Sequence, residues 1–454
     1  MDETILQHVK HIHFIGIGGS GMSPLAGILH QEGFILTGSD NNETDTLNWI
    51  RHLGIQVYMG HKAENIGNAE MVVYTAAVHE DNPEMQAAHE KGVPLYSRAE
   101  LLGLLSRHYQ DTIAVSGTHG KTTTTSMLTQ ILLTADLDPT AVIGGKLPLI
   151  GGGFRVGKTD LMACEACEFQ DSFLTLHPAV AVILNIDNDH MEYFKTMDNL
   201  IAHFSQFASQ TRRTLVYNGD DANTLKAVAN SSLKKVTFGF DPSNQYTAIN
   251  IGVANHHLHF DILRDGQKIA HVALKIPGKH NILNALAACA AASIAGASDT
   301  AIEKGLNDFS GAGRRFEVLG QTSNGVTIAD DYAHHPTELE ATLKASQELG
   351  YKNVWAVFQP FTFSRTAMLL DDFAAALKLA DRVVLAPIMG SREVNTLGIR
   401  SEDLAAKIPG SVCKPDFDAI ANYVLAHAKE HDLVMTFGCG DIYKAAKKML
   451  QIGK

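Results

Sequence analysis

A strand, a glycine turn and a helix start follow one another directly in residues 111–128, DTIAVSGTHGKTTTTSML. The turn contains Gly117 and Gly120, and the helix opens with Lys121 and Thr122. Backbone amides at a helix N-terminus can cradle phosphate oxygens, while the lysine reaches the terminal phosphates and the threonine hydroxyl binds Mg²⁺. The alternative is an ordinary helix start whose threonine hydroxyls cap free amides. The order of these residues favours a phosphate-binding loop, with a tighter turn than G-x-x-x-x-G-K-[ST].

A second glycine turn, FIGIGGSGM, places Gly16, Gly18 and Gly21 in a G-x-G-x-x-G arrangement after a strand. The next strand ends at Asp40, where a ribose partner lies in dinucleotide-binding folds. The alternative is a tight turn that allows close helix packing and binds no ligand. Two glycine turns that open helices indicate two phosphorylated ligands.

Strands and helices alternate through most of the chain, which predicts α/β architecture with parallel sheets covered by helices on both faces. The segment IGVANHHLHFDIL alternates apolar and polar residues and predicts antiparallel strands. At about 150 residues per domain, 454 residues correspond to roughly three domains. Polar clusters at 107–111 and 311–314 are typical of linkers.

Composition excludes several classes of protein. The net charge of -12 argues against a nucleic-acid partner. No apolar run approaches the roughly 18 residues of a membrane span, and Met1-Asp2-Glu3 does not start a signal peptide, so we expect a cytoplasmic protein without a membrane partner. Cys164 and Cys167 form a C-x-x-C pair, but no second pair follows, which favours small apolar residues over a metal or redox site.

Polar residues at predicted strand ends indicate a metal site. Glu165 and Glu168 end one strand, and His190 follows NIDND after another. If these ends meet at one sheet edge beside Lys121, they can hold a divalent metal that bridges nucleotide phosphates. A solvated carboxylate pair and a hydrogen-bonded histidine is the alternative.

Two further segments carry polar clusters. In GKHNILNALAA, His280, Asn281 and Asn284 open a helix, where they either cap it or read a purine, and the cap is the simpler explanation. DDYAHHPTE, residues 330–338, crowds carboxylates, a tyrosine and histidines at a strand end, which is costly to satisfy without a ligand or metal. The motifs RRFE, FQPFTFSR, MGSREVNTLG and TFGCGDI also lie at strand ends of this last region.

The motifs GIGGSGMSPLA, GTHGKTTTT, EACE, NIDNDH, GKHNILNALAA, RRFE, DDYAHHPTE and GCGDI occur in the order and spacing of the Mur ligases. The chain resembles this family over almost its whole length, and within it the members that add L-alanine to UDP-N-acetylmuramate. The resemblance implies three domains: a Rossmann-like UDP-sugar domain at 1–108, a central P-loop ATPase-type domain with a mixed sheet at 109–313, and a Rossmann-like domain at 314–454 that closes over ATP and binds the amino acid.

The resemblance also implies chemistry. ATP phosphorylates the lactyl carboxylate of UDP-N-acetylmuramate, and the amine of L-alanine attacks the acyl phosphate, in cytoplasmic peptidoglycan precursor synthesis. The implied cofactors are ATP and Mg²⁺, with Mn²⁺ as a substitute, and the protein is expected to be a monomer or weak homodimer.

The residue roles come from the same resemblance. The implied ATP contacts are Gly117, Thr118, His119, Gly120, Lys121, Thr122, Thr123, His280, Asn281, Arg315 and Asp331. The implied UDP-sugar contacts are Gly18, Ser20, Gly21, Met22, Asp40 and Thr75. The implied metal ligands are Thr122, Glu165 and His190. The implied contacts to UDP-N-acetylmuramate and alanine are Tyr332, His334 and Arg365. The implied catalytic residues are Lys121, Glu165, His190, His334 and Arg365.

The chain departs from the family at two points. Phe361 and Thr362 stand where many relatives have His-Arg, which leaves Arg365 as the basic residue of that turn. EACEFQ replaces EADESD but keeps Glu165 and Glu168. We assign no carbamylated lysine.

Three other functions compete with this interpretation. A recycling ligase that adds a tripeptide to UDP-N-acetylmuramate shares the ATP apparatus. A dinucleotide-dependent oxidoreductase explains GIGGSGM and Asp40 but leaves the Lys121 loop without a role. A nucleotide-regulated binding or assembly protein would use both loops without forming an amide.

Overall fold

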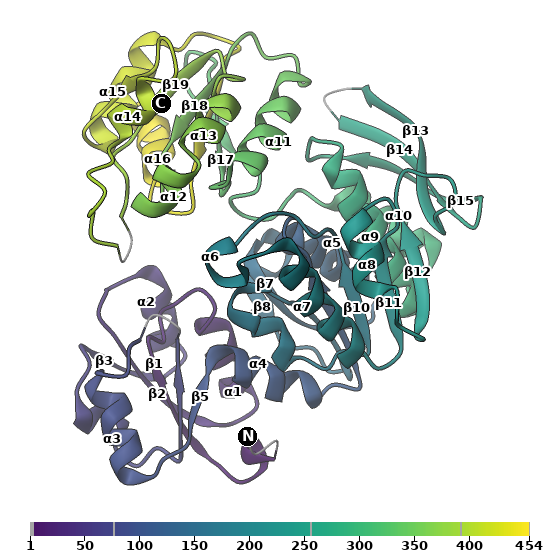
Figure 1. The fold of residues 1–454 in the computed structure, drawn as a ribbon, viewed down its shortest axis with the longest axis vertical. Helices are drawn as coiled ribbons and strands as arrows, with labels where there is room; N and C mark the ends of the chain where they lie inside the picture. The colour runs from purple at the N-terminus through teal and green to yellow at the C-terminus, as the bar shows by residue number, and fades with distance from the viewer. Residues whose placement is uncertain (1–3, 76–77, 255–256, 391–392, 454) are drawn as a thin grey trace. The chain divides into compact units, whose positions relative to one another are not determined.

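The computed structural model describes residues 4–75, 78–254, 257–390 and 393–453. Three β-sheets are present in this part of the chain, each flanked by helices (Figure 1). The predicted α/β class and three-domain architecture are confirmed. By contacts the chain separates into two compact units, one formed by 1–248, 262–270 and 283–306, the other by 249–261, 271–282 and 307–454.

The first sheet has the strand order β3-β2-β1-β4-β5, and all its pairings are parallel. Its strands are β1 (His11–Ile15), β2 (Ile35–Asp40), β3 (Gln56–Met59), β4 (Met71–Tyr74) and β5 (Leu95–Ser97). Its helices are α1 (Ser23–Gln31), α2 (Asp45–His52), α3 (Pro83–Lys91) and α4 (Arg98–Arg107), with 3-10 turns at Ile5–Gln7 and Ala63–Ile66. The central strand β1 lies where the strand order reverses, the usual place for a ligand in such sheets.

The second sheet has the order β15-β14-β13-β12-β11-β10-β6-β9-β7-β8. It is parallel from β7 to β13, and β8 pairs antiparallel with β7. Its strands are β6 (Asp111–Ser116), β7 (Thr140–Leu147), β8 (Gly152–Arg155), β9 (Leu161–Glu165), β10 (Val180–Ile183), β11 (Thr214–Asn218), β12 (Lys234–Phe238), β13 (Tyr246–Ala254), β14 (His257–Arg264) and β15 (Gln267–Leu274).

Helices and short 3-10 turns connect these strands. They are α5 (Lys121–Thr134), η3 (Pro148–Ile150), η4 (Phe169–Thr175), α6 (Met191–Phe194), α7 (Met197–Gln210), α8 (Ala222–Val228), α9 (His280–Ile294) and α10 (Asp299–Asp308). The order β10-β6-β9 places the ends of β9 and β10 on either side of β6. The sequence predicted that these two strand ends, at Glu165 and before His190, lie at one edge of the sheet.

The third sheet has the order β16-β17-β21-β18-β19-β20, with β16 antiparallel to β17 and the other pairings parallel. Its strands are β16 (Glu317–Gln321), β17 (Thr327–Asp331), β18 (Val354–Phe358), β19 (Arg382–Leu385), β20 (Val412–Cys413) and β21 (Leu433–Phe437). Its helices are α11 (Pro336–Gln347), α12 (Phe363–Met368), α13 (Leu370–Leu377), α14 (Ser401–Ala405), α15 (Phe417–His427) and α16 (Tyr443–Ile452).

The first two sheets share a hydrophobic core. One continuous cluster runs from Phe14 in β1 to Phe173 and Phe204 beside the second sheet. Trp49 of α2 and Phe154 of β8 pack edge to face across it, with their ring centroids 5.4 Å apart. This shared core explains why the first two sheets form one compact unit although the sequence predicts separate domains.

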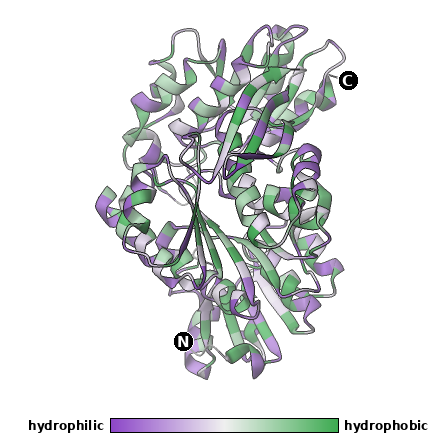
Figure 2. Cartoon of the chain, turned by 90° about the vertical axis from the view of Figure 1, so that its right-hand side faces the viewer, coloured by the Kyte–Doolittle hydropathy of each residue, from purple (hydrophilic) through white to green (hydrophobic). Residues whose placement is uncertain are grey.

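The third sheet has apolar clusters on both of its faces, one including Leu339 and Phe373 and the other including Ile420 and Met449. Figure 2 shows largely hydrophobic strands beside helices that mix hydrophobic and hydrophilic residues. Within the described residues, every helix is too short or too polar to cross a bilayer.

Candidate active site

The first glycine turn is fastened to the end of β2. The amide of Gly16 donates to the carbonyl of Ser39 at 2.8 Å, and the amide of Gly18 donates to Oδ2 of Asp40 at 2.9 Å. A left-handed φ of +80° at Gly16 suits glycine. Asp40 therefore closes the turn from the neighbouring strand, and its contact with the UDP-sugar remains a prediction.

Other predicted UDP-sugar residues gather at the same turn. Thr75 lies against Gly16, since a Cβ there would be 2.7 Å from Thr75 Cγ2. Ser20 is exposed, Gly21 lies against the Arg98 side chain, and Met22 is buried at the start of α1. The structure thus brings this set together at the carboxyl end of β1.

The second glycine turn opens α5 without a side-chain cap. Gly120 is the N-cap residue, with a left-handed φ of +88°. A Cβ at Gly120 would lie 2.4 Å from Oδ1 of Asn284, and one at Gly117 would lie 2.9 Å from Cβ of Leu184. The threonines do not cap this helix, so the structure favours a phosphate-binding N-terminus over an ordinary capped start.

Lys121 is held by a carboxylate inside this loop. Its Nζ donates to Oε2 of Glu168 at 2.9 Å and to the carbonyls of Gly117 and Thr118 at 2.5 and 3.1 Å. The Glu168 side chain is only 2% exposed. Burial alone would lower the pKa of Lys121, but the nearby Glu168 carboxylate outweighs it and raises the pKa above its ordinary value. Lys121 is therefore a fixed positive charge at the start of α5.

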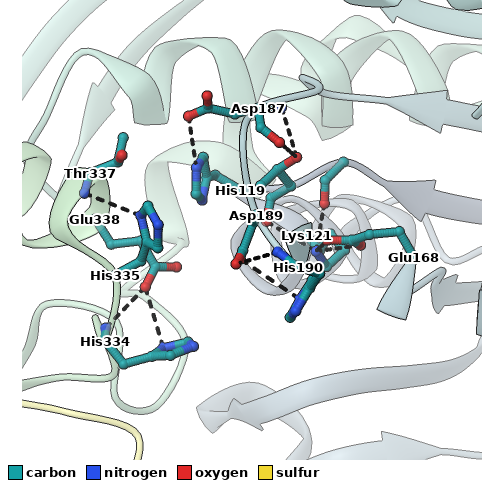
Figure 3. A network of polar contacts seen from close by, with 12 residues as sticks. His119, Lys121, Glu168, Asp187, Asp189, His190, His334, His335, Thr337 and Glu338 are labelled. Carbon is teal, nitrogen blue, oxygen red and sulfur yellow. Dashed lines mark hydrogen bonds and ion pairs between the residues drawn. The ribbon is translucent and has the colours of Figure 1, made fainter. Parts of the chain in front are cut away.

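The segment after β10 holds the loop in place, and sequence reasoning missed its role. Asn185 Oδ1 accepts from the His119 amide at 2.8 Å, and Asn185 Nδ2 donates to the His119 carbonyl at 3.0 Å. The Asp187 amide donates to Thr118 Oγ1 at 2.9 Å, and Asp187 Oδ2 lies 3.3 Å from His119 Nε2 (Figure 3). The signal for both residues was their position in NIDND, directly after a buried strand.

Glu165 and His190 lie at the ends of the strands that flank β6. Glu165 is half-buried, and its Oε1 accepts from the Gly144 amide at 2.6 Å. His190 precedes α6 with a left-handed φ of +56°, and its ring lies 4.7 Å from that of Phe169. The sequence treated Glu165 and Glu168 as one pair, whereas the structure gives each carboxylate a different partner.

The donor set at this edge fits Mg²⁺. No group of three or more His, Cys, Asp or Glu side chains suited to a metal occurs among the described residues. Mg²⁺, however, usually takes one or two protein oxygens and fills its remaining positions with phosphate and water. The carboxylate of Glu165 and the hydroxyl of Thr122, in the first turn of α5, are ligands of that kind.

His280 and Asn281 open α9, as the sequence predicted. Asn281 is 6% exposed, and its Nδ2 donates to the carbonyl of Pro277 at 2.6 Å. Asn281 thus stabilises its own turn, and its contact with adenine remains a prediction. Asn284, one turn later, lies instead against Gly120.

Arg314 organises the end of β17. Its Nε is 2.7 Å from Oδ2 of Asp330, which is 1% exposed, and its terminal nitrogens donate to the carbonyls of Gly438 and Gly440. The guanidinium also lies over the Tyr332 ring, 5.0 Å from the centroid. Burial raises the pKa of Asp330, and Arg314 opposes this shift. Arg314 therefore satisfies the buried carboxylate of Asp330, one of the polar groups that the sequence marked as costly to bury.

Asp331 anchors the loop that follows β17. Its two carboxylate oxygens accept from the amides of Phe316 and Ala333, both at 2.8 Å. Burial raises the pKa of Asp331 to about 6, although the positive charge of Arg315 opposes this shift.

Tyr332, His334 and Arg315 lie together beside this loop. The rings of Tyr332 and His334 are 5.5 Å apart, and the guanidinium of Arg315 is 5.1 Å from the Tyr332 centroid. Glu338 Oε2 accepts from the His334 amide at 3.0 Å (Figure 3). Burial lowers the pKa of His334 despite the Glu338 carboxylate, and the charge of Arg365 lowers it further. The imidazole of His334 is therefore neutral at pH 7.

The departure at Thr362 has a structural role. Thr362 is the N-cap of α12, and its hydroxyl accepts from the amide of Arg365 at 3.4 Å.

Cys439, which follows β21 in TFGCGDI, is a neighbour of Arg365 that sequence reasoning did not single out. Burial raises the pKa of Cys439 to about 12, and the charge of Arg365 acts against this shift. Its thiol is therefore protonated at pH 7.

Comparison with known proteins gives the family. Three family models match in succession: the Mur ligase family catalytic domain at 11–110, the Mur ligase middle domain at 115–292 and the Mur ligase glutamate ligase domain at 314–440. The UDP-N-acetylmuramate--L-alanine ligase of Acetivibrio thermocellus is 44% identical over 450 residues, covering 97% of this chain and 96% of that protein. The chain belongs to the Mur ligase family.

Other Mur ligases match over similar lengths. The UDP-N-acetylmuramate--L-alanine ligase of Caldanaerobacter subterraneus subsp. tengcongensis is 43% identical and covers both chains completely. The crystal structure of UDP-N-acetylmuramate-alanine ligase from Thermotoga maritima aligns with a TM-score of 0.84 at 28% identity, covering 98% and 99% of the two chains. A murein peptide ligase from Psychrobacter arcticus aligns with a TM-score of 0.74 at 25% identity, covering 97% and 98%.

Proposed function

We propose that this Mur ligase uses ATP to join L-alanine to the lactyl carboxylate of UDP-N-acetylmuramate. The observation that carries the proposal is the 43–44% identity, over at least 97% of this chain, to relatives named for this reaction. The two glycine turns support it, because each opens a helix at the carboxyl end of a different sheet, as two phosphorylated substrates require.

The phosphate loop supplies the first chemical step. A carboxylate is a poor acyl donor, so one of its oxygens must leave as phosphate, and phosphoryl transfer depends on positioning and on positive charge. Lys121 and the N-terminus of α5 stabilise the transferred phosphoryl group, and residues 117–123 surround the nucleotide. Thr122 and Glu165 would hold one Mg²⁺ and His190 a second, and these ions would neutralise phosphate charge; Mn²⁺ is a substitute.

The third domain supplies the second step. Arg315 and Asp331 contact ATP, while His280 and Asn281 contact its adenine. Tyr332, His334 and Arg365 face UDP-N-acetylmuramate and alanine, and Arg365 suits the amino-acid carboxylate. Because the pKa of His334 is lowered, its neutral imidazole can accept a proton as the amine attacks.

The remaining assignments complete the proposal. The UDP-sugar binds at the first turn, through Gly18, Ser20, Gly21, Met22, Asp40 and Thr75. The domains are 1–108, 109–313 and 314–454, and the third closes over ATP to exclude water from the acyl phosphate. The protein works in the cytoplasm, in peptidoglycan precursor synthesis, as a monomer or weak homodimer.

The direct test measures phosphate release from ATP in the presence of Mg²⁺ and UDP-N-acetylmuramate. We expect release only when L-alanine is added, together with a new amide product. Equal release without an amine would contradict the proposal, and release with the tripeptide alone would identify a recycling ligase instead. A panel including glycine and serine measures the strictness for L-alanine.

Lys121→Ala should abolish phosphate release, because it removes the positive charge at the phosphates, and should leave UDP-N-acetylmuramate binding near its normal value. Lys226→Ala, at an exposed position of α8, is the matched control. Loss of both phosphate release and UDP-N-acetylmuramate binding in Lys121→Ala would contradict the assignment of the two ligands to separate turns.

A further inference from the structure

The turn after β9 contains two successive left-handed residues that are not glycine. Gln170 has φ +50° and ψ +39°, and Asp171 has φ +58° and ψ +19°. L-residues with side chains avoid this conformation, so surrounding contacts must hold it. The turn begins at Glu168, the partner of Lys121, and continues through Phe169, whose ring lies against His190.

Asp171 connects this turn to two helices. Its Oδ2 accepts from the hydroxyl of Tyr193 in α6 at 2.5 Å, and its Oδ1 accepts from Nδ1 of His203 in α7. Donating this hydrogen bond to the Asp171 carboxylate raises the pKa of Tyr193 to about 12, so the phenol remains the donor across the physiological range. The ring of His203 also packs edge to face on buried Phe194, 5.2 Å away.

Two contacts therefore join the same two segments. The ring of Phe169 lies against that of His190, immediately before α6, and Asp171 binds Tyr193 within α6. Phe169 and Asp171 are two residues apart on the turn, and their partners His190 and Tyr193 are three residues apart at α6. Together the two contacts fix both the position and the orientation of α6 relative to the turn.

We propose that Asp171 is a positioning residue for the proposed ligase reaction, which locks the 168–171 turn to α6 and thereby sets Glu168 at Lys121 and His190 at the end of β10. This inference rests on the proposed function only for its kinetic consequence. Asp171 acts through the turn, where its amide donates to the carbonyl of Glu168 at 3.0 Å, and through Tyr193.

The test compares Asp171→Asn with Asp138→Asn in the full chain. Asp138 is a matched control, because it too has a left-handed φ, is about equally exposed and forms an ion pair, with Arg155, in the same domain. Amide hydrogen exchange is measured without ligand, alongside kcat and KM. Far-UV circular dichroism checks folding, and Tyr193→Phe replaces Asp171→Asn if that variant does not fold.

We expect Asp171→Asn to accelerate exchange at both 168–171 and 190–194 and to lower kcat by about tenfold or more, as for residues that orient site groups. The KM for UDP-N-acetylmuramate should change less than about twofold, because its turn lies on another sheet. Asp138→Asn should leave the exchange of both segments and kcat unchanged.

Unchanged exchange at 190–194 in Asp171→Asn, or equal kcat losses in Asp171→Asn and Asp138→Asn, would overturn the proposal. A double variant Asp171→Asn with Tyr193→Phe should lose no more kcat than Asp171→Asn alone, since both changes remove the same Asp171–Tyr193 contact. Additive losses of kcat would contradict this. If the wild type forms no amide, the proposed function fails, but hydrogen exchange still decides whether Asp171 couples the two segments.

Discussion

At the scale of the single residue, Asp331 makes the stability of the protein depend on pH. Its carboxylate is 6% exposed, and burial raises its pKa to about 6. In an unfolded chain the pKa is about 3.9, so between these values the folded protein keeps a proton that the unfolded chain releases. The stability from this group is fully present below about pH 4 and is lost as pH rises through 6.

Asp331→Asn should remove this dependence. The unfolding free energy of the wild type relative to the variant should fall by about 2 kcal/mol between pH 4 and pH 7, because one pKa unit corresponds to about 1.4 kcal/mol. Urea denaturation followed by fluorescence of Trp355, in the same domain, measures the difference. Asp372→Asn, at an exposed position of α13, is the control. A difference that stays constant with pH would contradict the burial effect.

Single residues also show how far the sequence could be interpreted. Lys121 was predictable because strand, glycines and lysine follow one another locally. Asn185 and Asp187 were not, because their partners lie 66 to 69 residues earlier in the chain. Glu165 and Glu168 have equal chemistry in the sequence, and only the path of the turn after β9 sends Glu168 to Lys121. Their individual roles could therefore not be separated by spacing.

At the scale of the element, the start of α5 depends on glycine at position 120. Gly120→Ala would place a Cβ 2.4 Å from Oδ1 of Asn284 and would force a left-handed alanine. Gly151 shares the left-handed conformation, with φ +65°, but a Cβ there meets nothing within 4 Å. Comparing alanine variants at these two positions therefore separates the cost of a left-handed backbone from the cost of steric crowding at the loop.

Gly151→Ala should lower the unfolding free energy by about 1 kcal/mol, the cost of a left-handed residue, and leave ADP binding unchanged. Gly120→Ala should cost about 2 to 3 kcal/mol and weaken ADP binding, because Asn284 or the loop must move. Urea denaturation and calorimetric titration with ADP measure both effects. Equal stability losses with unaltered ADP binding would show that the loop tolerates the added methyl group.

Most elements could be predicted, since β-branched strands and glycine turns are local signals. The packing between them could not. Trp49 and Phe154 are separated by more than 100 residues, and nothing in their local sequence indicates that α2 meets β8. The sequence therefore predicted the alternation of strands and helices in the first two sheets but not their common core.

At the scale of the whole molecule, the two tryptophans of the sequence report on different units. Trp49 lies in the first unit, against Phe154, and Trp355 lies in β18 of the second, where its Nε1 donates to Asp432 at 3.1 Å. Trp355→Phe and Trp49→Phe therefore give variants whose fluorescence follows one unit each. Separate units need not unfold together, so the two transitions can be measured independently.

UDP-N-acetylmuramate should raise the midpoint of the Trp49 transition more than that of Trp355. A ligand at about 100 times its Kd stabilises the unit that binds it by about 2.7 kcal/mol. Urea titrations with and without the UDP-sugar, in each single-tryptophan variant, measure the shifts. Equal shifts in both variants would place the UDP-sugar contacts outside the first unit alone.

The shared core of the first two sheets limits how this chain can be recombined. The hydrophobic cluster holds Phe14 and Phe173 together, and the Trp49–Phe154 contact crosses the predicted boundary at residue 108. A chimaera that exchanged the first sheet with that of a distant relative would face a mismatched apolar surface, although both ligand turns were intact. We therefore expect that the two sheets can be exchanged only together, as one module, and that a substitution on one side of the Trp49–Phe154 contact needs a matching change on the other.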